Sequence, residues 1–326
     1  MGIPLPPFLC PHLFASLTKA GVVNPGPTRY RPARMKHTMT RRQFLAATAV
    51  AATTGVCFPR LLRAAEAPAP RDLGFPVVDF HVHLDNSTID RVVELSRERG
   101  IKFGIVEHAG TKENKYPVVL SNDTELKRYM AMLEGQPVFK GVQTEWTDWM
   151  SCFSRDTLAQ LDYVLTDTMT FPGKDGQRVK LWEPGVEERV DMADKQAWMD
   201  RYVDWHVEII SKQPIDILAN TSWLPAAMAD DYASYWTPAR MQKVIDAARR
   251  HRVAFEISAS FKLPKLSFLR AAHAAGIKFV LGSNGRYPNM GRLDYSLAMA
   301  KELGLKRADL FTPAPDGQKA VQRRKY

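Results

Sequence analysis

Short apolar runs alternate with amphipathic helical patterns from residue 75 onward, and this alternation constrains the fold more than any other feature. Runs rich in Val, Ile and Phe are typical of buried strands, and helical connections between them predict parallel pairing. The runs are FPVVDFHVHL (75–84), KFGIVEH (102–108), PVFKGVQTEW (137–146), DYVLTDTMTF (162–171), PIDILANTSW (214–223), VAFEISA (253–259) and IKFVLGSNG (277–285). Because neither a repeat nor a linker interrupts residues 75–305, we predict one barrel-like domain of seven β/α units.

Helical patterns lie between and after these runs. Several begin with Ser, Thr, Asp or Pro and end with Gly, as helix caps require. The patterns cover residues 88–100, 122–135, 194–213, 237–252, 264–276 and 291–304. They supply the crossovers that a parallel barrel needs.

The formal net charge of +10 belongs mostly to the amino-terminal segment. Residues 1–67 hold nine of the 45 Lys and Arg residues but one of the 35 acidic residues, which leaves 36 basic and 34 acidic residues for the rest. A nearly neutral body lacks the basic surface that nucleic-acid binding requires. We therefore expect a small-molecule substrate and no nucleic-acid partner.

Residues 1–67 are predicted to be an amino-terminal tail followed by an export signal. Arg41 and Arg42 precede a short run of Ala, Val and Thr, which resembles a twin-arginine leader, and small residues near Ala65 offer a cleavage site. The run is too short to span a bilayer stably. We expect recognition by the twin-arginine export machinery, a periplasmic or otherwise exported protein, and no stable membrane anchor after cleavage; a buried Ala-rich helix is the alternative.

The mature chain is then predicted to consist of a catalytic barrel at 68–310 and a flexible basic tail at 311–326. Loss of the leader also removes Cys10 and Cys57. Cys152 is left alone, so the body cannot form an internal disulfide and must rely on its core.

Six of the seven apolar runs end in polar or charged residues. A parallel barrel gathers the carboxyl ends of its strands at one mouth, where active sites lie, so these side chains should converge. They are His81 and His83, Glu107 and His108, Glu145, Asp167, Asn220, and Ser283 with Asn284. Each one alone has a structural explanation, such as capping a turn, but their recurrence favours a functional site.

The pair His81 and His83 is the most specific of these signals. Residues i and i+2 of a strand point to the same side, so both imidazoles should project together and share one cation. The alternative is that one histidine is a core residue and the other is exposed.

These motifs resemble the polymerase-and-histidinol-phosphatase (PHP) superfamily over residues 75–305. DFHVHL matches its opening motif, GIVEHAG and KGVQTEW the second and third, LDYVLTDTM and PIDILANTSW the fourth and fifth, and IKFVLGSNGRYP the last. The resemblance implies a distorted seven-stranded (β/α)7 barrel, similar to a TIM barrel, that binds divalent metals and hydrolyses phosphoesters. It also implies that His81 and His83 bind the first metal, that Glu145 bridges, and that His108 serves a neighbouring metal.

The chain departs from the family where further ligands are expected. Met169 or Asp167, Asn220, Asn284 and Arg286 stand at four such positions. Asn is a weak neutral ligand and Arg is none, so the full cluster cannot form. We expect one Zn, Mn or Fe ion held by His81, His83 and Glu145, with Asn284 as a weak ligand and a weaker second site around His108.

The expected reaction is hydrolysis of a phosphoester or other small ester by a metal-bound hydroxide. Glu107 and Asp167 are candidate acids or bases, and Arg286 is a candidate clamp for a phosphate or carboxylate, or else part of a surface salt bridge. The insertion at 171–194 is at a position where barrel enzymes often have a lid, and tryptophans near the mouth are typical of sites that bind sugar rings. An amidohydrolase-type enzyme and a non-catalytic barrel that binds an anionic or sugar ligand stay open as alternatives.

Overall fold

The computed structural model describes residues 73–326. The tail and the predicted export signal, with Cys10 and Cys57, lie outside the described residues. Within the described part, none of the helices has the length and apolar character needed to cross a membrane.

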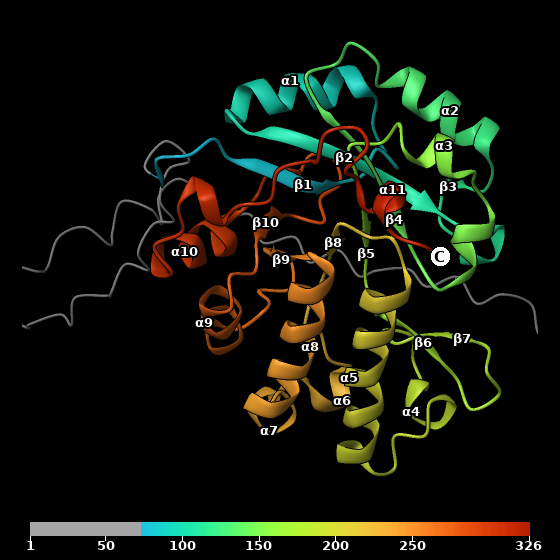
Figure 1. Ribbon diagram of the computed structural model, residues 1–326, viewed down its shortest axis with the longest axis vertical. Coiled ribbons are helices and arrows are strands. Elements are labelled where there is room, and N and C mark those ends of the chain that lie inside the picture. Colours follow the sequence, from blue (N-terminus) through green and yellow to red (C-terminus); the bar gives the residue numbers. More distant parts are fainter. Residues whose placement is uncertain (1–72) are drawn as a thin grey trace, which may run out of the picture. The chain divides into compact units, whose positions relative to one another are not determined.

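Seven parallel strands form a closed barrel, as the sequence predicts. β1 pairs with both β2 and β10, which closes the ring (Figure 1). The strands are β1 (Val78–Val82), β2 (Lys102–Ala109), β4 (Phe139–Thr144), β5 (Tyr163–Thr166), β8 (Ile217–Leu218), β9 (Ala254–Ser258) and β10 (Phe279–Gly282). Each coincides with one predicted apolar run, with β2 ending one residue beyond its run, so the predicted α/β fold, a seven-stranded barrel of the TIM type, is confirmed.

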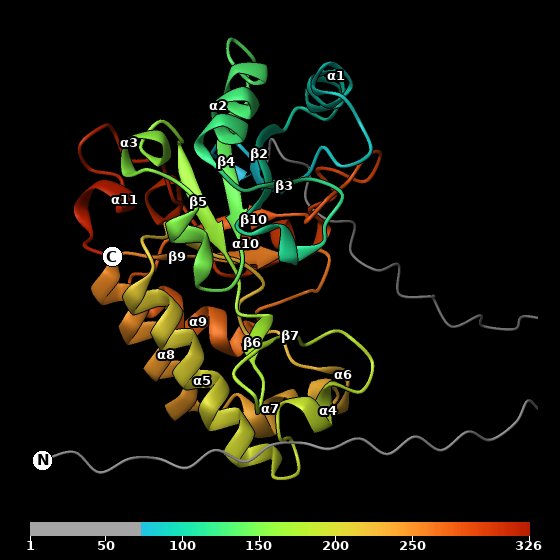
Figure 2. The ribbon, with the colours of Figure 1, turned by 90° about the vertical axis from the view of Figure 1, so that its right-hand side faces the viewer.

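Six long helices follow the predicted helical patterns. They are α1 (Ile89–Arg99), α2 (Asp123–Met132), α5 (Lys195–Lys212), α8 (Pro238–His251), α9 (Leu266–Ala274) and α10 (Asp294–Glu302). Side-chain caps fix three of their starts: Asn122 accepts from the Glu125 N–H, Asp194 from the Gln196 and Ala197 N–H groups, and Thr237 from the Arg240 N–H. In both views α5 and α8 run side by side outside the barrel (Figure 2).

The barrel interior is filled by an apolar cluster around Tyr163. The Tyr163 ring lies against Gly141, so close that a Cβ atom added to Gly141 would lie 2.5 Å from Tyr163 Cζ. The Tyr163 hydroxyl donates a hydrogen bond to the Phe80 carbonyl oxygen at 2.7 Å. Gly141 therefore provides the space that one large ring needs inside a narrow barrel.

Short elements that the sequence did not indicate surround the mouth. β3 (Val119–Leu120) pairs with β2, and the predicted run 162–171 divides into β5 and β6 (Thr170–Pro172). β6 pairs antiparallel with β7 (Arg178–Lys180), and α4 (Val186–Arg189) follows. The insertion at 171–194 is thus a hairpin with a helical turn, and its Trp182 lines the barrel mouth.

The carboxyl-terminal segment packs on the body, which corrects the prediction of a flexible tail. The Phe311 N–H donates to the Phe279 carbonyl oxygen at 2.9 Å, and α11 (Ala320–Arg323) buries Ala320 and Val321. Arg324 donates to the carbonyl oxygens of α5 residues. Apolar side chains spaced along a polar segment are enough to hold it against the barrel.

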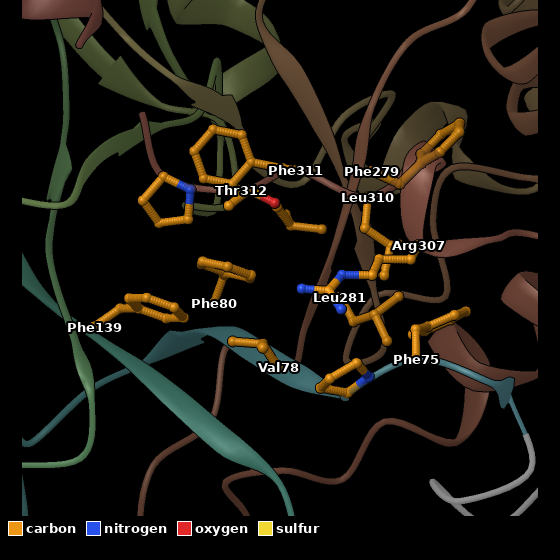
Figure 3. Close-up of a pocket in the computed structure, with 13 residues that line it drawn as sticks. Phe75, Val78, Phe80, Phe139, Phe279, Leu281, Arg307, Leu310, Phe311 and Thr312 are labelled. Carbon is orange, nitrogen blue, oxygen red and sulfur yellow. The ribbon is translucent and has the colours of Figure 1, made fainter. Parts of the chain in front are cut away.

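Phe311 also helps to line an apolar cavity at the amino end of the barrel. The cavity has a volume of about 170 Å³ and is enclosed largely by Phe, Val, Leu and Pro side chains (Figure 3). Phe80 stacks on Phe139 with ring centres 5.5 Å apart and meets Phe311 edge-on at 5.6 Å. Aromatic packing thus fills this end of the barrel.

Candidate metal site at the carboxyl end of the barrel

The carboxyl ends of the strands surround a cavity of about 340 Å³, the mouth cavity. Six of its lining residues come from strand ends or the loops that follow them: His108, Gln143, Asp167, Asn220, Asn284 and Arg286. Tyr116, Trp182, Trp223 and Phe261 complete much of the wall. Among the residues singled out from the sequence at the ends of the apolar runs, His108, Asp167, Asn220, Asn284 and Arg286 therefore share one cavity.

A β-bulge in β1 directs the two histidines toward the mouth. Asp79 pairs with Phe103 and Val82 with Ile105, so β1 contains one residue more than β2 over this stretch. Phe80 joins the interior cluster, while His81 and His83 lie beyond it with ring centres 5.2 Å apart. The extra residue allows an apolar side chain and an imidazole to face the interior in succession.

His81 belongs to a closed hydrogen-bond network. Its Nδ1 lies 2.8 Å from Glu256 Oε1 and its Nε2 lies 2.9 Å from Gln143 Oε1. Gln143 in turn donates from Nε2 to Asp167 Oδ2 at 3.0 Å, which fixes its oxygen toward His81. Burial alone would lower the pKa of His81, but the Glu256 carboxylate raises it overall. Both ring nitrogens have a partner, so neither is free for a metal in this arrangement.

Glu256 and Asp167 anchor the rest of this network. Glu256 Oε2 accepts from the Asn220 N–H at 2.7 Å, and Asn220 Nδ2 lies 3.4 Å from Asp167 Oδ2. Burial, aided by the Glu145 carboxylate, raises the pKa of Asp167 to about 7. Asp167 therefore has a pKa at which a side chain can both accept and donate a proton near neutral pH. Glu256 was not a predicted site residue; a carboxylate within the apolar run 253–259 was the available signal.

His83, unlike His81, lies outside this hydrogen-bond network. Its side chain is 0% exposed, and neither ring nitrogen has a hydrogen-bond partner. Burial, with the nearby His108 and His81 rings, holds its pKa well below the usual value. A buried neutral imidazole with a free lone pair is the form that binds metals.

Two carboxyl groups lie beside His83 and form with it a group that could hold a metal ion. Donor atoms of His83, Asp85 and Glu107 all lie within 4.8 Å of one another. Among the described His, Cys, Asp and Glu side chains, no other three meet this condition. Asp85 Oδ1 and Glu107 Oε2 are buried without a partner, while Glu107 Oε1 accepts from the Leu84 N–H at 2.8 Å.

Burial raises the pKa of Glu107 to about 8, and the Asp85 carboxyl contributes to this shift. Two carboxyl groups and a neutral imidazole in one buried place form a donor set that suits a divalent cation. Sequence reasoning missed Asp85. Asp85 continues the alternate-residue spacing of His81 and His83, and this spacing was the sequence signal that could have identified it.

His108 and Glu145 occupy the far side of His83. His108 stacks between His83 and Tyr116, with ring centres at 4.8 and 3.5 Å. His108 Nδ1 lies 3.3 Å from Glu145 Oε1, and Thr170 Oγ1 donates to Glu145 Oε2 at 3.4 Å. Burial lowers the pKa of His108. The structure thus brings Glu145 to His108, not to the group formed by His83, Asp85 and Glu107.

Arg286 closes the group toward the mouth cavity. Its Nε donates to Asp85 Oδ2 at 2.6 Å, and its Nη1 lies 3.3 Å from Asn284 Oδ1. The Asn284 amide oxygen therefore faces a guanidinium. Asn284 and Asn220 have φ of 47° and 48°, a left-handed conformation that Asn tolerates better than most residues. Backbone conformation is a sufficient reason for Asn at both strand ends.

No family model matches the chain, and no curated protein matches it. Solved structures show only distant likeness. A chain of an archaeal ribonuclease P with mature tRNA is 12% identical, with a TM-score of 0.34 over 70% of this chain and 89% of that chain. A citrate synthase SbnG is 14% identical (TM-score 0.33, 72% and 97%), and an HpcH/HpaI aldolase from Desulfitobacterium hafniense is 15% identical (TM-score 0.31, 66% and 88%). Likeness at this level carries no argument about family or function.

Proposed function

We propose that the protein is a metal-dependent hydrolase that binds one divalent cation through His83, Asp85 and Glu107. One observation carries this proposal: the two ring nitrogens of His83, Asp85 Oδ1 and Glu107 Oε2 are all buried without a partner. Each such atom destabilises a protein by about 1–3 kcal/mol unless something binds it. A cation in contact with all three side chains would remove most of that penalty.

The donor types narrow the choice of metal. One imidazole and two carboxylates suit Zn, Mn or Fe, and three protein ligands leave positions open for water and substrate. When bound, such an ion supplies a Lewis acid that polarises a substrate oxygen and lowers the pKa of water. This proposal replaces His81 and Glu145 by Asp85 and Glu107 in the ligand set, because His81 already has a partner at each nitrogen.

The protein's own side chains would perform the remaining steps. Arg286 lines the mouth cavity and is held by Asp85, so its guanidinium is oriented to bind an anionic group of the substrate. Asp167 lines the same cavity with a pKa of about 7 and can hold or release a proton there. The reaction that these groups support best is hydrolysis of a phosphoester or a carboxylic ester.

Kinship with the PHP superfamily is part of the proposal. The seven-stranded barrel and the motif DFHVHL at the end of its first strand support it. Export by the twin-arginine route is a separate proposal, which depends on Arg41, Arg42 and the short apolar run that follows them.

Metal binding by four variants tests the assignment. The purified protein is stripped with a chelator and titrated with Zn²⁺ and Mn²⁺ by calorimetry, beside Glu107→Gln and His83→Ala. Loss of a ligand should weaken binding at least about tenfold, because even residues that only hydrogen-bond a ligand have effects of this size. His81→Gln and Glu145→Gln are the matched controls and should keep wild-type affinity to within about threefold, because the polar partners of His81 and Glu145 are not the proposed ligands.

Two results would contradict the proposal. A folded wild-type protein that takes up neither metal would exclude the cation. Weakened binding in His81→Gln and Glu145→Gln, with Glu107→Gln unchanged, would exclude this ligand set. Glu107→Gln nearly preserves shape, so it stays informative where His83→Ala fails to fold.

A further inference from the structure

Two residues of the candidate metal group line a second cavity, and Arg286 links the group to the mouth cavity. Besides the mouth cavity, a second cavity of about 720 Å³ reaches Asp85 and Glu107; we call it the lateral cavity. Consecutive residues of a strand point to opposite sides, and accordingly Glu107 lines the lateral cavity while His108 lines the mouth cavity. The ion pair between Asp85 and Arg286 joins a residue of one cavity to a residue of the other.

The two cavities differ in the side chains that they offer. The mouth cavity is rich in amides and aromatic rings. The apolar part of the lateral cavity wall is mainly aliphatic, with Leu84, Ile89, Pro117, Val118, Leu120 and Met132, while the charged Lys112, Glu125 and Arg128 in the same wall are exposed or partly exposed. Its buried polar atoms without a partner belong to Asp85, Ser87 and Glu107, which stand at or just after the carboxyl ends of β1 and β2. A molecule in the lateral cavity would thus have an aliphatic part near the wall and a polar group near the metal ligands.

Exposed apolar side chains are concentrated around the same two cavities. In the described part of the chain, the large apolar residues that are at least 36% exposed are Val118, Met132, Trp182, Phe261 and Tyr326. Val118 and Met132 line the lateral cavity, and Trp182 and Phe261 line the mouth cavity. Exposed apolar surface that gathers at cavities rather than scattering marks a binding site.

We propose that the substrate is an ester with an aliphatic chain, which occupies the lateral cavity while the polar remainder occupies the mouth cavity. This inference rests on the proposed function, since it places the ester group at the residues assigned to the metal. Val118 and Met132 are then specificity-determining residues. They select the chain by burying its methylene groups and take no part in bond cleavage.

Neutral alcohols test the lateral cavity independently of the metal. 1-Octanol and 1-butanol carry the same hydroxyl group, which can donate to the free Glu107 oxygen, and they differ only in four methylene groups. Calorimetric titration of the metal-free protein should give octanol binding at least about tenfold tighter than butanol binding, because each buried methylene adds affinity.

Variants locate the effect. Val118→Asp and Met132→Lys should each reduce the octanol-to-butanol affinity ratio at least about threefold, because each places a charge on the aliphatic wall. Tyr326→Lys makes a matched change at an exposed apolar residue outside both cavities and should leave the ratio unchanged. Both target residues are partly exposed, so unchanged circular dichroism will verify that the variants fold.

The outcomes separate this inference from the proposed function. A protein that binds metal as expected but shows no preference for octanol would overturn the inference alone. The same holds for a preference that persists in both cavity variants. Octanol binding by a protein that takes up no metal would overturn the proposed function and, with it, the assignment of an ester substrate.

Discussion

The two ends of the barrel differ in whether their side chains have partners within the protein. At the amino end, Phe80, Phe139 and Phe311 pack ring against ring, and the remaining cavity of about 170 Å³ is apolar (Figure 3). At the carboxyl end, His83 and Glu107 are buried but have ring and carboxyl atoms without partners. The amino end is organised for stability, whereas the carboxyl end keeps buried polar groups that no described residue satisfies, as sites for ligands do.

The contrast also applies within the carboxyl end. His81 and His83 are two residues apart and equally buried, yet His81 has a partner at each nitrogen and His83 at neither. Glu256 and Gln143, on strands β9 and β4, account for the difference. A histidine is therefore assigned to structure or to ligand binding by its surroundings and not by its motif.

The largest expected effect distinguishes the two ends by stability. Phe80→Ala should lower the free energy of unfolding by about 3–5 kcal/mol, because it removes a buried ring and leaves a cavity. Phe261→Ala, at the mouth, should lower it by less than about 1 kcal/mol, because that ring is 36% exposed. Urea denaturation measures both values. Equal losses in the two variants would contradict the view that only the amino end is built for stability.

A second prediction concerns pH and the mouth. The pKa of Asp167 is about 7 in the folded protein and about 3.8 when exposed, so the folded state holds this proton more tightly. The stability of the metal-free protein should accordingly fall as pH rises from about 4 to about 7 and stay low above that, by up to about 4 kcal/mol from this group.

Asp167→Asn isolates the contribution of this carboxyl group. Asp216, whose pKa burial raises to about 6, contributes in the same direction but is present in both proteins. Urea denaturation at several pH values between 5 and 8 gives the difference in unfolding free energy between wild type and Asp167→Asn. This difference should change as the pH rises to about 7 and level off above that. A difference that is independent of pH would show that Asp167 titrates normally.

The smallest expected effect concerns the space inside the barrel. Gly141→Ala should destabilise the protein by about 1–3 kcal/mol, because the new methyl group would press on the Tyr163 ring. Metal affinity should not change, since the substitution lies toward the amino end of β4. A thermal unfolding scan combined with a Zn²⁺ titration tests both parts, and a change in affinity would mean that the two ends of the barrel are coupled.

Much of the fold could be predicted from the sequence. Each of the seven barrel strands coincides with a predicted apolar run, because alternation of strands and helices is a local signal. β3 has two residues and lies in no predicted run, and β6 follows β5 so closely that the run 162–171 did not separate them. The packing of the carboxyl-terminal segment also escaped prediction, because Phe311, Ala320 and Val321 gain their burial from surfaces formed by distant residues.

The site was predictable in place but not in detail. Polar residues at strand ends located the mouth, since parallel strands present their carboxyl ends at one edge. The partners of each side chain could not be inferred in the same way. Glu256 lies 175 residues after His81, and Asp85 reaches Arg286 across 201 residues.

The sequence by itself determined the barrel and the end of it that carries chemistry, because hydrophobic periodicity and strand direction are properties of neighbouring residues. Only the tertiary structure decided which groups are satisfied and which are free. The bulge in β1 and the carboxylate of Glu256 engage His81, and the approach of Asp85 and Glu107 surrounds His83 with unpartnered oxygens. Hydrogen bonding and burial depend on atoms that the closed barrel brings together from distant parts of the chain, and no local sequence pattern encodes which atoms come into contact.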